Sequence, residues 1–350
     1  MMPFQKIKQD NLIKLLFGFL ICFTLNVFAW DISSYSSQFR SGDKQRHRVS
    51  VRHIEKGGIG YDQGYTTFEG FFSTDPNFST GMPFLDLRAH VFNNGKFASN
   101  VGIGLRKIDG CRVYGINAYY DYRKTQKNNY NQIGIGLETI GNLWDFRVNG
   151  YIPVGREISQ ISNSKFAGFL GHHMMLSQKY QFAMKGGNAE LGFHFGKSDF
   201  YDFYAAFGPY SFSGKIGPKI WGGKGRFVFR YKEYLTLELS NSYDKMFRNR
   251  FQGQITLTLP FGSGSCANQI DSGNSCCMPD VLLSRMVQPV ERQEIIVLGC
   301  KRNCSAAIDP TTGNPFNFIF VDNTSHSLGT YESPYPTLAL AQANSGAGDI

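Results

Sequence analysis

The most constraining feature of the sequence is a two-residue alternation of apolar and polar side chains across residues 112–153. Its middle segment sets branched apolar residues against polar residues and glycines: Ile133, Ile135 and Leu137 against Gln132, Gly134, Gly136 and Glu138. Such alternation predicts β-strands with one apolar and one polar face. Carboxylates and guanidinium groups lie on the polar face, and aromatic residues rim the apolar face. The pattern therefore favours a transmembrane β-barrel with a wet lumen over a soluble sandwich, which would bury its apolar face against a second sheet.

Twelve strands are predicted at regular spacing. Their ranges are 65–73, 83–92, 97–106, 112–121, 130–139, 143–152, 166–175, 187–196, 201–212, 224–232, 234–243 and 251–261. An even number is expected of a bacterial single-chain barrel. Aromatic residues make up 15% of the chain and glycines number 39, which suits many strands, tight turns and aromatic girdles. We therefore predict an all-β fold built on an antiparallel transmembrane barrel of about twelve strands.

The polar faces of these strands are predicted to line the lumen, and they carry both signs of charge. The lumen-facing residues are Asp86, Arg88, Asp121, Glu138, Asp145, Arg147, Asn149, Glu190, Arg230 and Glu238. Opposite charges on adjacent strands can pair across the wall. A barrel of this size leaves a lumen that must be wet or plugged. The charged, partly extended segment 278–300, which follows the last strand, is a candidate for such a plug.

Residues 1–29 have the pattern of a secretory signal peptide. A segment with three lysines precedes an apolar run at 15–25, and small residues follow, so cleavage is predicted between Ala29 and Trp30. The apolar run is too short to favour a membrane-anchor helix. The net charge is +9. Because an exported chain has little access to nucleic acid, we expect its partners to be outer-membrane lipid and lipopolysaccharide.

Five cysteines cluster late in the chain: Cys266, Cys276, Cys277, Cys300 and Cys304. In an oxidising envelope such clustering favours disulfides, and the irregular spacing argues against a zinc site. The pairing stays open, although Cys300 and Cys304 could close a small loop, and Cys111 stands alone beside a loop. We expect no metal and no cofactor. No spaced nucleophile motif stands out, so we also expect no enzyme activity.

Three motifs carry a resemblance to a known family. They are NAYYDY at 117–122, GIGLE at 134–138 and DFRVNGYIP at 145–153. This series resembles the β-domain of inverse autotransporters, the family of intimin and invasin, over residues 65–261. The resemblance implies a twelve-stranded outer-membrane barrel with a periplasmic N-terminus and a C-terminal passenger that is exported through the lumen and displayed at the cell surface.

The stretch 285–298 looks like the linker that threads the pore in this family. The residues carried over to that role are Arg285, Val287, Arg292, Ile295 and Val297. The segment 306–350 is similar to the opening turn of right-handed parallel β-helix passengers. The last predicted strand, which ends at Phe261, resembles the signal that barrel-assembly machinery reads.

These observations predict five parts. They are a signal peptide at 1–29, a short periplasmic lead at 30–64, the barrel at 65–261, a cysteine-bearing linker and pore-threading segment at 262–305, and the start of a truncated passenger at 306–350. The predicted function is an outer-membrane translocator and anchor that displays its passenger for adhesion or surface interaction, through an unidentified surface or host receptor. The alternative is a general outer-membrane porin with a cysteine-rich periplasmic tail.

Overall fold

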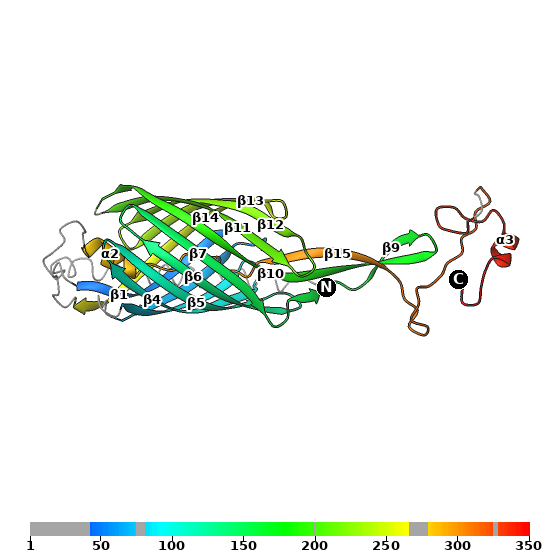
Figure 1. Cartoon of the computed structure of the whole chain (residues 1–350), viewed down its shortest axis with the longest axis horizontal. Coiled ribbons are helices and arrows are strands. Elements are labelled where there is room, and N and C mark those ends of the chain that lie inside the picture. The colour runs from blue at the N-terminus through cyan, green and yellow to red at the C-terminus, as the bar shows by residue number, and fades with distance from the viewer. Residues whose placement is uncertain (1–42, 75–80, 199, 266–278, 325–327) are drawn as a thin grey trace, which may run out of the picture. The chain divides into compact units, whose positions relative to one another are not determined.

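Twelve antiparallel strands form a closed barrel in the computed structural model, which describes residues 43–74, 81–198, 200–265, 279–324 and 328–350 (Figure 1). The barrel strands are β1 (Asp43–Glu55), β2 (Tyr65–Ser73), β3 (Met82–Phe92), β4 (Phe97–Asp109), β5 (Arg112–Lys124), β6 (Asn129–Ile140), β7 (Trp144–Val154), β10 (His173–Lys197), β11 (Tyr201–Gly214), β12 (Lys219–Tyr231), β13 (Leu235–Asp244) and β14 (Arg248–Ser265). Neighbours in sequence pair throughout, β14 lies beside β1, and β10 pairs with both β7 and β11. The predicted all-β, antiparallel barrel of about twelve strands is confirmed.

The alternation seen in the sequence becomes an outer apolar face and an inner polar face. On β7, Trp144, Phe146 and Val148 are exposed, whereas Asp145 and Arg147 are buried. On β6, Ile135 and Leu137 are 53% and 57% exposed. Exposed apolar side chains in a continuous band are stable only against lipid. The inner face therefore holds the polar interactions, and the outer face is the membrane surface.

The structure corrects the predicted strand positions in two places. Residues 43–55, expected within a lead with little fold of its own, form β1, which pairs with β2 from Arg48 to Ile54. The basic side chains of this segment masked its alternation. The predicted strand at 166–175 is not a barrel strand: it is divided between β9 (Lys165–Leu170) and the start of β10. The count of twelve was right because one missed strand offset one surplus strand.

β10 is much longer than its neighbours in the barrel. It has 25 residues, against 11 in β7 and 14 in β11. Its first half pairs with the short strands β8 (Ile158–Gln160) and β9 on one edge. The strand β15 (Leu298–Ala306) pairs with the same half of β10, from Ala183↔Leu298 to Met175↔Ala306 (Figure 1). β10 therefore continues past the barrel wall as the centre of a small sheet.

The described residues hold two helices. One is α2 (Pro279–Met286), whose last two residues overlap the predicted pore-threading stretch 285–298. The other is α3 (Leu338–Ala343), which is capped by the Thr337 hydroxyl accepting from the Leu340 N–H at 3.3 Å. In the described part of the chain, no helix is long and apolar enough to cross a membrane. The predicted cleavage site at Ala29 and Trp30, and Cys266, Cys276 and Cys277, lie outside the described residues.

Candidate functional site

The candidate functional site is the barrel lumen, which is occupied by the chain's own residues 287–297, here called the linker segment. This segment follows α2 and precedes β15. Its apolar side chains are buried, with Val290 2% exposed and Ile295, Ile296 and Val297 at most 1% exposed. Ile295 packs in a cluster with Ile54, Tyr61, Tyr65, Phe92 and Ala98 of the barrel. The segment is therefore enclosed by the inner wall.

Arg292 makes the most regular polar contact between the linker segment and the wall. Its Nη1 and Nη2 atoms each donate to a carboxylate oxygen of Asp121 on β5 at 2.7 Å. The guanidinium also lies 4.2 Å from the centre of the Tyr119 ring. Both charged side chains are at most 1% exposed. A planar guanidinium that grips a carboxylate with two parallel hydrogen bonds fixes orientation as well as charge.

Glu294 carries a negative charge and pairs with positively charged side chains of the wall. Its carboxylate accepts from Arg52 at 2.5 Å, from Arg88 at 3.0 Å and from the Tyr65 hydroxyl at 2.6 Å. Arg88 is in turn paired with Asp86 at 2.7 Å. The carboxylate is thus surrounded by three donors from β1, β2 and β3. Such full pairing is what a charge shielded from solvent requires.

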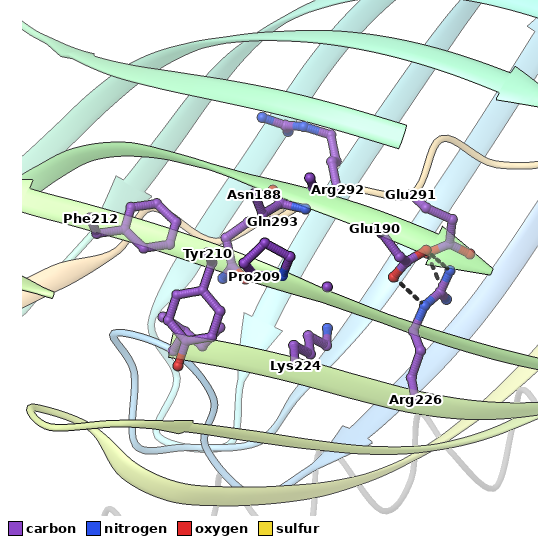
Figure 2. Close-up of a pocket in the computed structure, with 13 residues that line it drawn as sticks. Asn188, Glu190, Pro209, Tyr210, Phe212, Lys224, Arg226, Glu291, Arg292 and Gln293 are labelled. Carbon is purple, nitrogen blue, oxygen red and sulfur yellow. Dashed lines mark hydrogen bonds and ion pairs between the residues drawn. The ribbon is translucent and has the colours of Figure 1, made fainter. Parts of the chain in front are cut away.

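Two further charges of the chain beyond the barrel meet complementary groups. Arg285, at the end of α2, donates to Asp145 at 2.5 Å and also donates to the carbonyl of Gly141. Glu291 pairs with Arg226 of β12 at 3.0 Å. Figure 2 shows Glu291, Arg226 and Glu190 converging beside a small hollow that the linker segment shares with β10, β11 and β12. Each of the four charged side chains described between residues 285 and 294 therefore pairs with an oppositely charged side chain of the wall.

Wall side chains also satisfy the backbone of the linker segment, which forms neither helix nor ladder there. Arg106 donates to the carbonyls of Gln288 and of Met286, the last residue of α2, both at 2.6 Å. Arg88, Asn149, Asn100 and Arg123 donate to the carbonyls of Val290, Glu291, Glu294 and Ile296. The Tyr151 hydroxyl accepts from the Gln293 N–H at 2.7 Å. Buried peptide groups need such partners, so the lumen is built to hold an extended chain.

The ten predicted lumen-facing residues all carry polar contacts, but they divide into two groups. Those that contact the linker segment or α2 are Arg88, Asp121, Asp145 and Asn149. The others pair within the wall: Asp86 with Arg88, Glu138 with Arg106, Arg147 with Asp145, Glu190 and Glu238 with Arg226, and Arg230 with Asp202. The second group therefore fixes the geometry of the first.

Sequence reasoning missed four arginines of this site. Arg52 was missed because its strand was not predicted. Arg106, Arg123 and Arg226 lie on predicted strands or directly after one, and their alternation with apolar neighbours was the available signal. Arg226, for example, lies four residues before the predicted lumen residue Arg230, so the two side chains share one face of the strand. The five predicted pore-threading residues, Arg285, Val287, Arg292, Ile295 and Val297, are all placed against the inner wall, with Val287 8% exposed.

Three of the cysteines lie in the described part of the chain. Cys300 and Cys304 are free and exposed on β15, opposite Gln181 and Ser177 of β10. Four residues along a strand span about 13 Å, so these two thiols cannot close a loop with each other. Cys111, whose pairing the sequence left open, is disulfide-bonded. Within the described ranges, no group of three or more His, Cys, Asp or Glu side chains could hold a metal ion.

Comparisons with known proteins agree with this architecture. Residues 47–166 match the family model of the inverse autotransporter β-domain, and the match begins inside β1. No curated protein matches the chain. A chain solved in a study of the in-meso crystallization of membrane proteins is similar at 12% identity and a TM-score of 0.51, covering 73% of this chain and 100% of that one. The shared feature is the fold.

Two autotransporter barrels are also similar at lower scores. The translocator domain of the autotransporter NalP from Neisseria meningitidis has 11% identity and a TM-score of 0.27, covering 68% of this chain and 96% of that one. The β-domain of the Bordetella autotransporter BrkA has 11% identity and a TM-score of 0.29, covering 63% and 100%. The resemblance to inverse autotransporter β-domains is confirmed by the family match, and with the closed barrel it supports an outer-membrane translocator barrel.

Proposed function

With an inverse autotransporter β-domain matched over residues 47–166, we propose that this barrel exports and anchors its own C-terminal region at the cell surface. The linker segment is the part of the chain that remains in the lumen after export. Residues beyond β15 are the start of the displayed passenger. The passenger serves adhesion or surface interaction, through a surface or host receptor of unknown identity.

The observation that carries this proposal is the charge match between the wall and the chain from the end of α2 through the linker segment. Arg285, Glu291, Arg292 and Glu294 each meet an opposite charge, and at least five of the segment's carbonyls accept from wall side chains. A conducting porin needs no such partner for its inner wall. A tail left in the periplasm would leave these wall charges facing water. The arrangement favours a translocator over the porin alternative.

The proposal also assigns an orientation. The β6–β7 turn lies at the end of the barrel where α2 contacts Gly141, here called the α2 end. β1 runs away from this end, and β14 runs toward it. The chain leaves through the other end, where β15 pairs with β10. The α2 end faces the periplasm, where barrel-assembly machinery would receive the chain. The other end faces outward, among lipopolysaccharide.

Epitope tags on intact cells test the export and the orientation together. One tag follows Ile350. Two controls use barrel turns: Asn94, in the β3–β4 turn at the outward end, and Glu233, in the β12–β13 turn at the α2 end. We expect antibody to label the tags at 350 and 94 on intact cells, and the tag at 233 only after the outer membrane is opened. Labelling at 94 without labelling at 350 would refute export, and labelling at 233 alone would reverse the orientation.

A further inference from the structure

A small sheet continues the barrel past its outward end. Inside the barrel, β11 pairs with β10 as far as Met184↔Gly214. Directly beyond this point β15 takes the same edge, starting at Ala183↔Leu298, and the Met184 N–H donates to the Val297 carbonyl at 3.0 Å. β15 therefore joins a preformed strand edge as the chain leaves the lumen. Addition of a strand to an exposed edge is a common way to capture an extended peptide.

The tip of this sheet is a two-residue turn between β9 and β10. Gly171 has φ +59°, and a type II′ hairpin turn favours glycine at this first central position. The tip binds residues far along the chain. The Phe318 N–H donates to the His172 carbonyl at 2.7 Å, and the Tyr331 N–H donates to the Gly171 carbonyl at 3.0 Å. The Gly171 N–H donates to both carboxylate oxygens of Glu332 at 3.1 Å.

Phe169, two residues before the turn, anchors an aromatic cluster. Its ring centre lies 5.2 Å from Phe318, 4.9 Å from Phe320 and 5.6 Å from Tyr331. The Nδ1 atoms of His172 and His173 lie within hydrogen-bond distance of the Phe318 and Phe316 carbonyls, at 2.9 and 3.1 Å. The hairpin thus contacts two stretches of the segment, near 316–320 and 331–332.

Among the described residues of 316–350, few contacts could hold the segment folded without the hairpin. It makes a parallel bridge between Val321 and Tyr335, and Ile350 exchanges backbone hydrogen bonds with Asn317 and Ile319. These contacts resemble one turn of a parallel β structure. However, its large apolar side chains are mostly exposed, with Leu338 75% and Leu328 65% exposed. One turn of a repeat cannot bury its own apolar face, so an end needs a cap.

We propose that the β9–β10 hairpin is an intramolecular folding template, which captures the exported chain and sets the first turn of the passenger. This inference rests on the proposed function, because the template acts on a chain that emerges from the lumen. β15 pairs first, since it emerges nearest the barrel and finds a free edge. The turn and the Phe169 cluster then fix residues 316–320 and 331–332. Each later turn of the passenger can add to this first one, as in other repeat proteins.

Hydrogen exchange of the full chain in detergent tests the template. The test variant is Phe169→Ala. The matched control is Phe166→Ala, the same change on the same strand at a side chain that is 61% exposed and whose ring contacts Phe169. A second variant, Glu332→Gln, weakens the contact from the passenger side and leaves the hairpin intact.

We expect Phe169→Ala to speed exchange of the amides of residues 316–335 by roughly tenfold or more, because three aromatic contacts are lost together. Glu332→Gln acts in the same direction with a smaller effect. The amides of β15 and of residues 178–183 keep their protection in both. Equal exchange at 316–335 in Phe169→Ala and Phe166→Ala would overturn the inference.

The order of folding gives a second readout. In pulse-labelled refolding of the unmodified chain, protection of residues 316–335 should appear with or after that of residues 173–183. Earlier protection of 316–335 would overturn the template, because that segment would then fold alone. Both readouts use purified protein. A failure of surface labelling would therefore refute the proposed export without changing the exchange result.

Discussion

Replacing Arg292 by methionine tests whether the linker segment is held in the lumen by the contacts described above. The change keeps the length of the side chain and removes its charge. Asp121 would then lose two hydrogen bonds of 2.7 Å, and both partners are at most 1% exposed in the unmodified chain. The Asp121 carboxylate would then be a buried charge without its cation. Water cannot solvate it well in an enclosed site, so the docked state is destabilised.

The magnitude follows from what Asp121 retains. Breaking a buried ion pair from one side costs about 3–5 kcal/mol. Asp121 still accepts from Asn100 at 2.8 Å and from Gln132 at 3.0 Å, so we take the lower end, about 3 kcal/mol. This corresponds to a roughly 100-fold shift from the docked toward the undocked linker segment.

Single-channel conductance of the reconstituted barrel measures that equilibrium, because only an undocked linker segment opens the lumen. Arg292→Met should raise the open fraction roughly 100-fold while it remains small. The control is Glu291→Gln, one residue away. Its side chain is 35% exposed, and Arg226 keeps Glu190 and Glu238, so we expect a change of less than about 1 kcal/mol. Equal conductance of the two variants would refute the assigned role of the Arg292–Asp121 pair.

Two further predictions concern the barrel itself, with stability measured by urea unfolding in lipid vesicles. Ile135→Arg puts a charge on the lipid face and should lower the free energy of unfolding by about 2–4 kcal/mol near the bilayer middle. Gln254→Arg, beside lumen carboxylates, should lower it far less. Equal losses in the two variants would refute the assignment of faces. Gly102→Ala places a Cβ 2.1 Å from the Tyr119 ring and should lower the free energy of unfolding by about 1–3 kcal/mol. In Gly150→Ala the new Cβ meets no atom within 4 Å, so this control should leave stability nearly unchanged. An unchanged stability of Gly102→Ala would contradict the packing described.

The barrel was predictable because its signal is local. Alternation along β5, β6 and β7 gives both the strands and their two faces, so residues such as Ile135 and Asp145 could be assigned from the sequence. β1 was not found because basic residues dominate it, and Arg52 was lost with it. The extension of β10 was not found either, since Gly171 divides the pattern and the partner strand β15 lies more than a hundred residues further on.

The sequence predicted that the lumen wall and the segment after the barrel carry charges, but not which charges pair. The sequence indicated charges of both signs on the wall and a charged segment after the barrel. It held no information on which charges meet, because pairs such as Arg292–Asp121 and Glu294–Arg52 are separated by 171 and 242 residues. The same reason hid Arg106, whose role is to satisfy linker carbonyls. The possible Cys300–Cys304 loop is not formed, because an extended strand separates the two thiols.

Photo-crosslinking in living cells tests most directly whether the linker segment occupies the lumen. The photoreactive residue p-benzoylphenylalanine replaces Tyr151, which is 2% exposed and accepts from the Gln293 N–H, or its neighbour Ile152, which is 59% exposed on the outer face. We expect crosslinks from position 151 to peptides of residues 287–297, and none from position 152. Absence of these peptides at position 151, or equal yields at both positions, would contradict the account.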